Sequence, residues 1–367
     1  MLKSCFSLLQ FQSNLSITRL FQLKGLINSN FLRLYSTTNK ISKLPEKKTT
    51  NKLISCLKLM RVDKPIGTWL LYWPGAWSIA LSASPGCLPD AYLLGLFGVG
   101  SFLMRSSGCI LNDLWDQDID KKVARTKSRP LANGELTEKE AVLLLGGLLS
   151  ASLAVLLQLN SLSIILGASS LWLVVVYPLA KRFTNWPQLV LGATFNWGAL
   201  LGCTAVTGKF VPEICIPLYL ACICWTMIYD TIYAFQDKKE DILIGLGSTA
   251  IVFDKNREAW LNFFGLTMMS NLLYSGYMQE LPWPFFVSLL VSSSHLIWQI
   301  KTLKIDNNFD CLKKFNSNKF IGITILIGII LSNLIKNNEE VIMEERDDDE
   351  EENYGINKRN MNINFYC

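Results

Sequence analysis

The sequence has 367 residues, of which half are hydrophobic and only 18% are charged, and its mean hydropathy is +0.27. This balance excludes an ordinary soluble domain and favours a membrane protein with several spans. The formal net charge is +5, and the charged residues are distributed unevenly along the chain, so their positions inform on membrane topology. No nucleic-acid partner is expected.

The first 45 residues contain basic residues from Lys3 to Lys43, many Ser, Asn and Leu, and no acidic residue before Glu46. This composition is typical of a mitochondrial transit peptide, whereas a secretory signal has one compact apolar core. We therefore expect 1–45 to be a disordered presequence, with a processing site near Arg33.

A membrane domain is predicted over 52–336, because nine apolar stretches close to the spanning length of about 20 residues follow one another. They are roughly 65–83, 91–111, 140–158, 161–180, 188–206, 211–229, 260–277, 283–300 and 320–335. The sequence thus predicts an all-α fold, a bundle of nine transmembrane helices around a central cavity.

Lys and Arg fall almost entirely in alternate connections between these stretches. The connections after the even-numbered stretches contain pairs such as Lys121 and Lys122 or Lys181 and Arg182, whereas the odd-numbered ones contain only Lys209. By the positive-inside rule, the basic connections share one side, which is the matrix side of the inner membrane in a mitochondrial protein. The acidic segment 337–367 then lies on the other side, and its composition predicts a disordered tail.

A first cluster of aspartates follows the second apolar stretch, in "NDLWDQDID". Asp113, Asp116 and Asp120 lie at helical positions i, i+3 and i+7, so they share a face, with Asn112 beside them. Asp118 is predicted to point away. The spacing of Asp116, Asp118 and Asp120 resembles a calcium loop, but Lys121 and Lys127 replace the required Gly and Glu, which excludes an EF-hand.

A second cluster follows the sixth stretch and therefore lies on the same side of the membrane. Asp230, Asp237 and Asp241 fall at i, i+7 and i+11, and Tyr233 lies on the same stripe. Two clusters separated by four spans come together if the helices close into a bundle, so one shared site is expected.

Aspartates along one helix face at membrane depth repel one another unless a cation binds them. Oxygen ligands suit Mg²⁺, which is commonly held by one or two carboxylates together with substrate phosphates. Metal ligands are predicted at Asp113, Asp116, Asp120, Asp237 and Asp241. The competing interpretations are aspartates that merely pair with neighbouring Lys and Arg, and a cation-coupled transporter.

Basic residues near the clusters favour a magnesium–diphosphate site over a cation pathway, because guanidinium and ammonium groups bind phosphate oxygens. Aromatic residues of the neighbouring spans belong mainly to packing or to interfacial belts, although a few could stabilise an allylic cation. The only histidine, His295, is predicted to be a packing residue. The expected substrate-binding residues are Arg61, Arg105, Asn112, Lys122, Arg129, Lys181 and Tyr233.

Four long motifs resemble the UbiA superfamily of intramembrane prenyltransferases over roughly residues 57–300. They are "LMRVDKPIGTWLLYWPGAWS", "NDLWDQDIDKKVARTKSRPLANG", "YPLAKRFTNWPQLVLGATFNWGALLG" and "WTMIYDTIYAFQDKKEDILIGLGSTA".

The resemblance implies a Mg²⁺-dependent enzyme that transfers a chain from polyprenyl diphosphate to the ring of 4-hydroxybenzoate, an early step of ubiquinone biosynthesis. A sister enzyme with another aromatic acceptor is the alternative. The resemblance further implies catalytic roles for Asp116, Asp120, Asp230, Asp237 and Asp241, aromatic-acid binding by Arg105, and diphosphate contacts by Arg129 and Lys181. The lipid bilayer and other enzymes of ubiquinone synthesis are the expected partners.

The chain departs from the family pattern at two positions. Gly247 stands where many relatives have Lys, so one basic diphosphate contact is either absent or supplied by Lys255. Phe235 stands where His is common. Neither departure changes an aspartate.

Overall fold

The computed structural model describes the backbone of residues 51–123 and 126–353, and the side chains up to 336. The predicted presequence and the last 14 residues of the acidic segment lie outside this part. All regular structure in the described part is helical, which confirms the predicted all-α class.

Within the described residues, six helical segments are long and apolar enough to cross a membrane. Two of them are interrupted, one between α7 and α8 and one between α9 and α10. The six are α4 (Ala91–Trp115), α6 (Glu138–Leu156), α7 with α8 (Ser161–Ser169, Leu171–Phe183), α9 with α10 (Pro187–Phe195, Gly198–Thr207), α11 (Pro212–Ala234) and α16 up to Lys336.

The other three predicted spans are also helices, but these helices are not among the six candidate spans. These are α3 (Ile66–Leu81), α14 (Arg257–Met278) and α15 (Trp283–Lys301). The count of nine spans therefore stays a prediction. Short helices complete the described chain, namely α2 (Lys52–Leu59), α5 (Gln117–Asp120), α12 (Lys238–Ile244), α13 (Thr249–Val252) and the 3-10 turn η1 (Asp254–Asn256).

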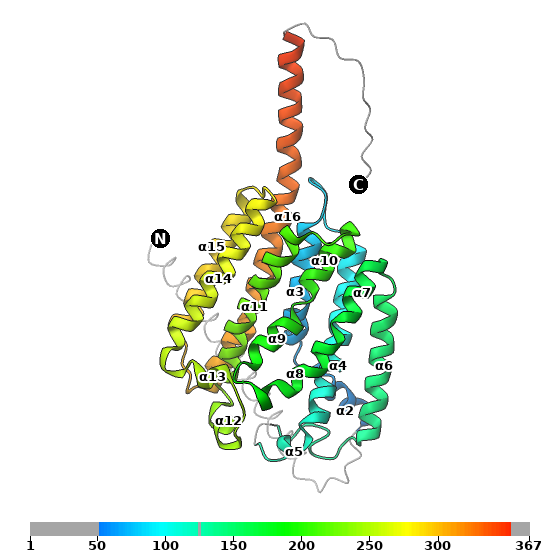
Figure 1. Cartoon of the computed structure of the whole chain (residues 1–367), viewed down its shortest axis with the longest axis vertical. Coiled ribbons are helices and arrows are strands. Elements are labelled where there is room, and N and C mark those ends of the chain that lie inside the picture. Colours follow the sequence, from blue (N-terminus) through cyan, green and yellow to red (C-terminus); the bar gives the residue numbers. More distant parts are fainter. Residues whose placement is uncertain (1–50, 124–125, 354–367) are drawn as a thin grey trace, which may run out of the picture. The chain divides into compact units, whose positions relative to one another are not determined.

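Helix α11 lies at the centre of the bundle, in contact with α3, α9, α10, α14 and α16 (Figure 1). Trp225 of α11 stacks on Trp77 of α3 with ring centroids 5.1 Å apart, and both rings are fully buried. Both indole N–H groups donate to α16 at 2.9 Å: that of Trp225 to Asn318 Oδ1 and that of Trp77 to the Gly322 carbonyl. Because buried indole groups need a partner, these bonds fix α3, α11 and α16 together.

Small residues let α3 and α10 pack closely. A Cβ on Gly202 would lie 2.7 Å from the carbonyl oxygen of Gly75, so only glycine fits there. Ser78 donates to the Ala199 carbonyl at 2.6 Å and accepts from the Cys203 N–H at 2.7 Å. Close backbone approach with hydroxyl bridges is a common way to join membrane helices.

The interruption between α9 and α10 faces the interior of the bundle. Asn196 is fully buried there, and its amide donates at 2.8 Å to both the Gly192 carbonyl and the Thr226 hydroxyl. Broken helices are tolerated at membrane depth where they line a cavity, because protein groups satisfy the freed backbone.

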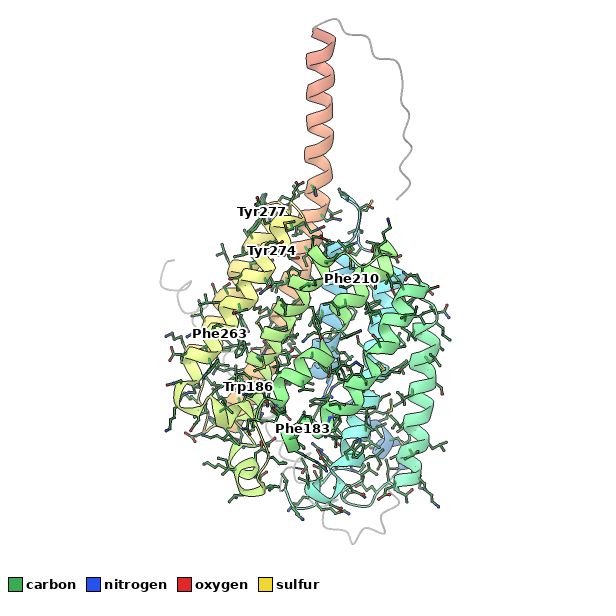
Figure 2. All side chains as sticks on the ribbon, in the orientation of Figure 1. Phe183, Trp186, Phe210, Phe263, Tyr274 and Tyr277 are labelled. Carbon is green, nitrogen blue, oxygen red and sulfur yellow. The ribbon has the colours of Figure 1, made fainter. Side chains whose placement is uncertain are left out.

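Exposed aromatic side chains lie towards both ends of the bundle (Figure 2). Phe210, Tyr274 and Tyr277 lie towards one end, and Phe183 lies towards the other. Such a distribution is typical of the two membrane–water interfaces. Helices α5 and α12, which contain the last aspartate of each cluster, both lie at the Phe183 end (Figure 1).

Helix α16 (Asn308–Asn353) continues beyond the apolar part into the acidic segment. The backbone is helical over 337–353, where the sequence predicted a disordered tail. Glutamate is a good helix former, and extension of an existing helix needs no new nucleus, so the helix can continue into this strongly acidic segment.

Candidate active site

A cavity of about 1650 Å³ opens within the bundle and is lined by residues of α2 to α12 and of α16. Its wall is charged where both aspartate clusters lie. It is apolar elsewhere, with Leu96, Phe97, Leu153 and Leu156 among its lining residues. The cavity can therefore hold a molecule with one anionic end and one hydrocarbon end.

The first cluster lies where α4 passes into α5. Asp116 caps α4, and the Asp120 N–H donates to its carbonyl at 2.8 Å, so the helical register continues through the break. Asp113, Asp116 and Asp120 are at most 5% exposed, whereas the side chain of Asp118 is 91% exposed. The predicted separation of these carboxylates into an inner face and an outward Asp118 is confirmed.

Cationic side chains from three segments surround the first cluster. Arg61 contacts both carboxylate oxygens of Asp113 at 2.8 and 2.9 Å, and Arg129 bridges Asp113 at 2.9 Å and Asp120 at 2.6 Å. Lys181 forms an ion pair with Asp116, and Arg182 donates to the same carboxylate at 3.3 Å. Buried charges are tolerated when they are paired in this way.

Arg61 has a left-handed backbone with φ of 59° and is the second residue after the end of α2. Its N–H donates to the Lys58 carbonyl and the Val62 N–H donates to the Leu57 carbonyl, the pattern of a Schellman motif. Glycine is the usual residue at this position, and a side chain there costs about 1 kcal/mol. The contact with Asp113 gives a physical reason for the arginine.

The second cluster lies where α11 passes into α12. Asp230 is in the last turns of α11, Asp237 caps α12, and the Asp241 N–H donates to the Asp237 carbonyl at 2.9 Å. Asp230, Asp237, Asp241 and Tyr233 all line the cavity that Asp113, Asp116 and Asp120 also line. The predicted convergence of the two clusters is therefore present.

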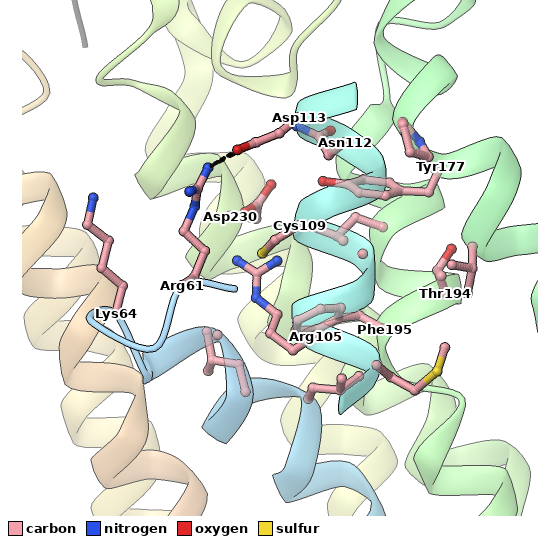
Figure 3. A pocket seen from close by; sticks show the side chains of 18 of the residues that line it. Arg61, Lys64, Arg105, Cys109, Asn112, Asp113, Tyr177, Thr194, Phe195 and Asp230 are labelled. Atoms are coloured by element: carbon pink, nitrogen blue, oxygen red, sulfur yellow. Dashed lines mark hydrogen bonds and ion pairs between the residues drawn. The ribbon is translucent and has the colours of Figure 1, made fainter. Parts of the chain in front are cut away.

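Deeper in the cavity, Arg105 points into the space between α4 and α11, close to Cys109 and Asp230 (Figure 3). Its guanidinium carbon lies 5.9 Å from the ring centre of Phe195, and its Nε is buried without a hydrogen-bond partner. Gly67 of α3 leaves room for it, because a Cβ there would overlap the guanidinium group. A buried cation with an unused donor is suited to a carboxylate ligand.

Among the predicted site residues, Lys122 alone lies away from the cavity lining, on the exposed surface. The side chains that line it are Arg61, Arg105, Asn112, Asp113, Asp116, Asp120, Arg129, Lys181, Asp230, Tyr233, Asp237 and Asp241. Lys122 follows Asp120 by two residues, so on a helical turn it faces away from the aspartate stripe.

Lys255, considered as a substitute for the missing Lys at 247, belongs to η1 and does not line the cavity. Phe235 is buried in the core. His295 bonds to the Ser317 hydroxyl at 3.0 Å between α15 and α16, away from the cavity lining, as its predicted packing role requires.

Sequence reasoning did not select four further cavity residues, Lys64, Tyr177, Gln188 and Lys319. Lys64 directly precedes the first predicted span and Lys319 directly precedes the ninth, although Lys319 lies within the long helix α16. A lysine inside a membrane helix is itself a functional signal, and it could have identified Lys319. Figure 3 shows Lys64 at the cavity wall, just before α3.

The donors in the cavity are carboxylate oxygens, which suit Mg²⁺. Within the described part of the chain, no group of three or more His, Cys, Asp or Glu side chains is close enough to hold an ion alone. This set fits a magnesium ion that completes its coordination with phosphate oxygens and water, as Mg²⁺ commonly does. It does not fit a closed protein-only metal centre.

The family model of the UbiA prenyltransferase family matches residues 71–323. Among curated proteins, the mitochondrial 4-hydroxybenzoate polyprenyltransferase of Aedes aegypti is 53% identical over 308 residues, 83% of this chain and 70% of that protein. The protein of the same name in Caenorhabditis elegans is 56% identical over 280 residues, covering 76% and 79%. The human one is 53% identical, covering 76% of each chain.

Solved structures have the same fold. A UbiA homologue from Aeropyrum pernix K1 superposes with a TM-score of 0.61 at 25% identity, covering 72% of this chain and 97% of that one. A UbiA homologue from Archaeoglobus fulgidus, solved with GPP and Mg²⁺, has a TM-score of 0.55 at 18% identity and covers 75% and 99%.

Proposed function

The chain belongs to the UbiA prenyltransferase family, and from this membership we propose that it transfers a polyprenyl chain from polyprenyl diphosphate to the ring of 4-hydroxybenzoate. The curated relatives that carry this activity in their names are more than half identical to it over most of its length. The observation that carries the proposal is the cavity, which joins two aspartate clusters and a basic rim to an apolar wall.

The charged end of the cavity holds the diphosphate in this proposal. Asp113, Asp116 and Asp120 on one side and Asp237 and Asp241 on the other are the residues that would hold Mg²⁺. When bound, the metal neutralises charge that develops on the leaving diphosphate. Arg129 and Lys181 lie at this end and supply the donors for phosphate oxygens.

The acceptor is held deeper in the cavity. Arg105 binds the carboxylate of 4-hydroxybenzoate, in keeping with its buried Nε, which has no hydrogen-bond partner among the described residues. Phe195, whose ring lies beside the Arg105 guanidinium, packs against the aromatic acceptor. This orientation directs the hydroxyl-bearing side of the ring towards the diphosphate.

The reaction breaks the C1–O bond of the donor, and the electron pair of that bond leaves with the diphosphate. The ring carbon next to the hydroxyl and meta to the carboxylate attacks the resulting allylic cation, and the ring then loses the proton from that carbon. Apolar walls and the aromatic rings of Phe195, Trp197 and Tyr229 in the lining exclude water and stabilise the cation.

The chain is a mitochondrial membrane protein by the names of its relatives and its apolar helices. We place it in the inner membrane with the cavity facing the matrix. The support for this orientation is the concentration of Lys and Arg in the connections at the aspartate end. The product would enter ubiquinone synthesis.

The test is a membrane assay with 4-hydroxybenzoate, a polyprenyl diphosphate and Mg²⁺, in which the prenylated acid is followed by mass spectrometry. We expect product and an equal amount of diphosphate, and loss of both when a chelator removes the metal. Folded protein that forms no product with donors of several lengths would contradict the proposal. If product forms only when another aromatic acid replaces 4-hydroxybenzoate, the enzyme uses a different acceptor.

A further inference from the structure

The loop between α12 and α13 lies against the end of α8. Gly247 in this loop donates its N–H to the Lys181 carbonyl at 2.9 Å. Two further bonds fix the loop: the Leu246 N–H donates to the Asp241 carbonyl at 2.9 Å, and the Thr249 N–H donates to Gln188 Oε1 at 3.0 Å. The loop therefore connects the helix of the second aspartate cluster to α8 and α9.

In this chain the backbone around position 247 leaves no room for a Cβ. A Cβ there would overlap the carbonyl oxygen of Thr184 and would lie 2.8 Å from its carbonyl carbon and 3.0 Å from the Asn185 Cα. All three atoms belong to the backbone, so no side-chain rotation can relieve the contact. The φ of Gly247 is not in the left-handed region, so the requirement comes from the close approach and not from backbone conformation.

The residue to which Gly247 is bonded carries a cation of the site. Lys181 forms an ion pair with the fully buried Asp116, and the next residue, Arg182, donates to the same carboxylate. A side chain at 247 would push the loop and the end of α8 apart by about 1 Å or more before ordinary contact distances are restored. Lys181 would then move relative to Asp116 and to Asp237 and Asp241.

We propose that Gly247 is a positioning residue, which holds Lys181 at the diphosphate end of the cavity by allowing the α12–α13 loop to close on α8. The inference rests on the proposed function, since the diphosphate is the ligand that Lys181 and the two clusters would share. The loop thereby sets the distance between groups contributed by α8 and groups contributed by α12.

The experiment compares Gly247→Ala with the wild type in the prenylation assay, with the KM for each substrate measured separately. We expect the KM for polyprenyl diphosphate to rise by about tenfold to a hundredfold, because a shift near 1 Å in a positioning group has effects of this size. The KM for 4-hydroxybenzoate should change less than about twofold. Gly147→Ala in α6 is the matched control, since a Cβ there meets open space, and it should behave as wild type.

A double substitution separates positioning from a general loss of stability. If Gly247 acts through Lys181, then Gly247→Ala adds no further rise in the diphosphate KM once Lys181→Met is present. An additive rise, or an unchanged KM in Gly247→Ala, overturns the inference, while an inactive wild type overturns the proposed function instead.

If Gly247→Ala does not fold, Gln188→Ala provides the same test without a steric clash, because it removes the bond that holds the loop at Thr249. It should raise the diphosphate KM by a smaller factor, and that rise should also vanish in the Lys181→Met background. An additive effect of Gln188→Ala would count against the inference.

Discussion

At the scale of single residues, the site is a balance of buried opposite charges. Asp113 and Asp116 are 1% exposed, and each contacts two cationic side chains. The periodicity of the aspartates was enough to predict which of them share a face. It could not predict their partners, because Arg61 lies 52 positions before Asp113 and reaches it only through a left-handed turn.

The first prediction contrasts two neighbouring aspartates. Asp116→Asn should lower kcat by about a hundredfold or more, because it removes a charge that the metal and Lys181 need at the reacting diphosphate. Asp118→Asn should stay within about twofold of wild type, since the Asp118 side chain is 91% exposed. The comparison is made in purified protein with equal thermal stability, and equal losses in both variants would contradict the assignment.

The second prediction concerns Arg105. Arg105→Ala should raise the KM for 4-hydroxybenzoate about tenfold or more, since a hydrogen bond to a charged group contributes about 1.5–3 kcal/mol. The KM for polyprenyl diphosphate should stay nearly constant.

The amide analogue 4-hydroxybenzamide provides the control for Arg105, because it lacks the carboxylate charge. Wild type and Arg105→Ala should then use the amide with similar KM values. If Arg105→Ala instead raises the KM for polyprenyl diphosphate, then Arg105 binds the donor and not the acceptor.

At the scale of helices, hydropathy predicted where the apolar segments lie because a span must be apolar along its whole length. It did not predict the interruptions at Ser170 and Asn196, because the local sequence stays apolar there and the break is fixed by side chains such as Thr226 of another helix. The contact of Gly247 with α8 could not be predicted from the sequence either, because it joins segments more than 60 positions apart.

Lys314 shows the same limit of sequence reasoning. Lys314 lies in the connection between the eighth and ninth predicted spans, but its side chain is 2% exposed inside the α15–α16 hairpin. Its ammonium donates to both carboxylate oxygens of Asp310, at 2.6 and 2.8 Å, and to the Thr302 carbonyl at the end of α15, at 2.8 Å. A cation is favoured at a helix C-terminus, so Lys314 joins the two helices.

The third prediction follows from this contact. Lys314→Met should destabilise the protein by about 3 kcal/mol, because it leaves the Asp310 charge and the Thr302 carbonyl without their partner. The measurement is the thermal unfolding midpoint in detergent, with Lys313→Met, an exposed neighbour, as the control. Equal midpoints for the two variants would contradict the structural role, and the KM values of folded Lys314→Met should match wild type.

At the scale of the whole molecule, the sequence predicted the most important feature of the site, the meeting of two distant clusters. An even number of spans separates the clusters, so both lie on the same side of the membrane, and charged helix ends there face a common interior. It could not give the shape of the cavity or the depth of Arg105, because these depend on how α3, α4 and α11 pack against one another.

The fourth prediction concerns orientation, which follows from the distribution of charge over the whole chain. Lys122 is exposed at the aspartate end, and Lys209 is exposed in the loop between α10 and α11. Replaced singly by cysteine, the two positions should lie on opposite sides of the inner membrane, because Lys and Arg are retained on the matrix side.

The measurement uses mitochondria without their outer membrane and a maleimide that does not cross the inner membrane, with the parent chain as the background for native thiols. Lys209→Cys should be labelled at once, and Lys122→Cys only after detergent opens the membrane. The reverse labelling pattern would show that the cavity faces the intermembrane space. Since both substitutions lie outside the cavity lining, each variant should retain prenylation activity, which ties the labelling result to correctly folded protein.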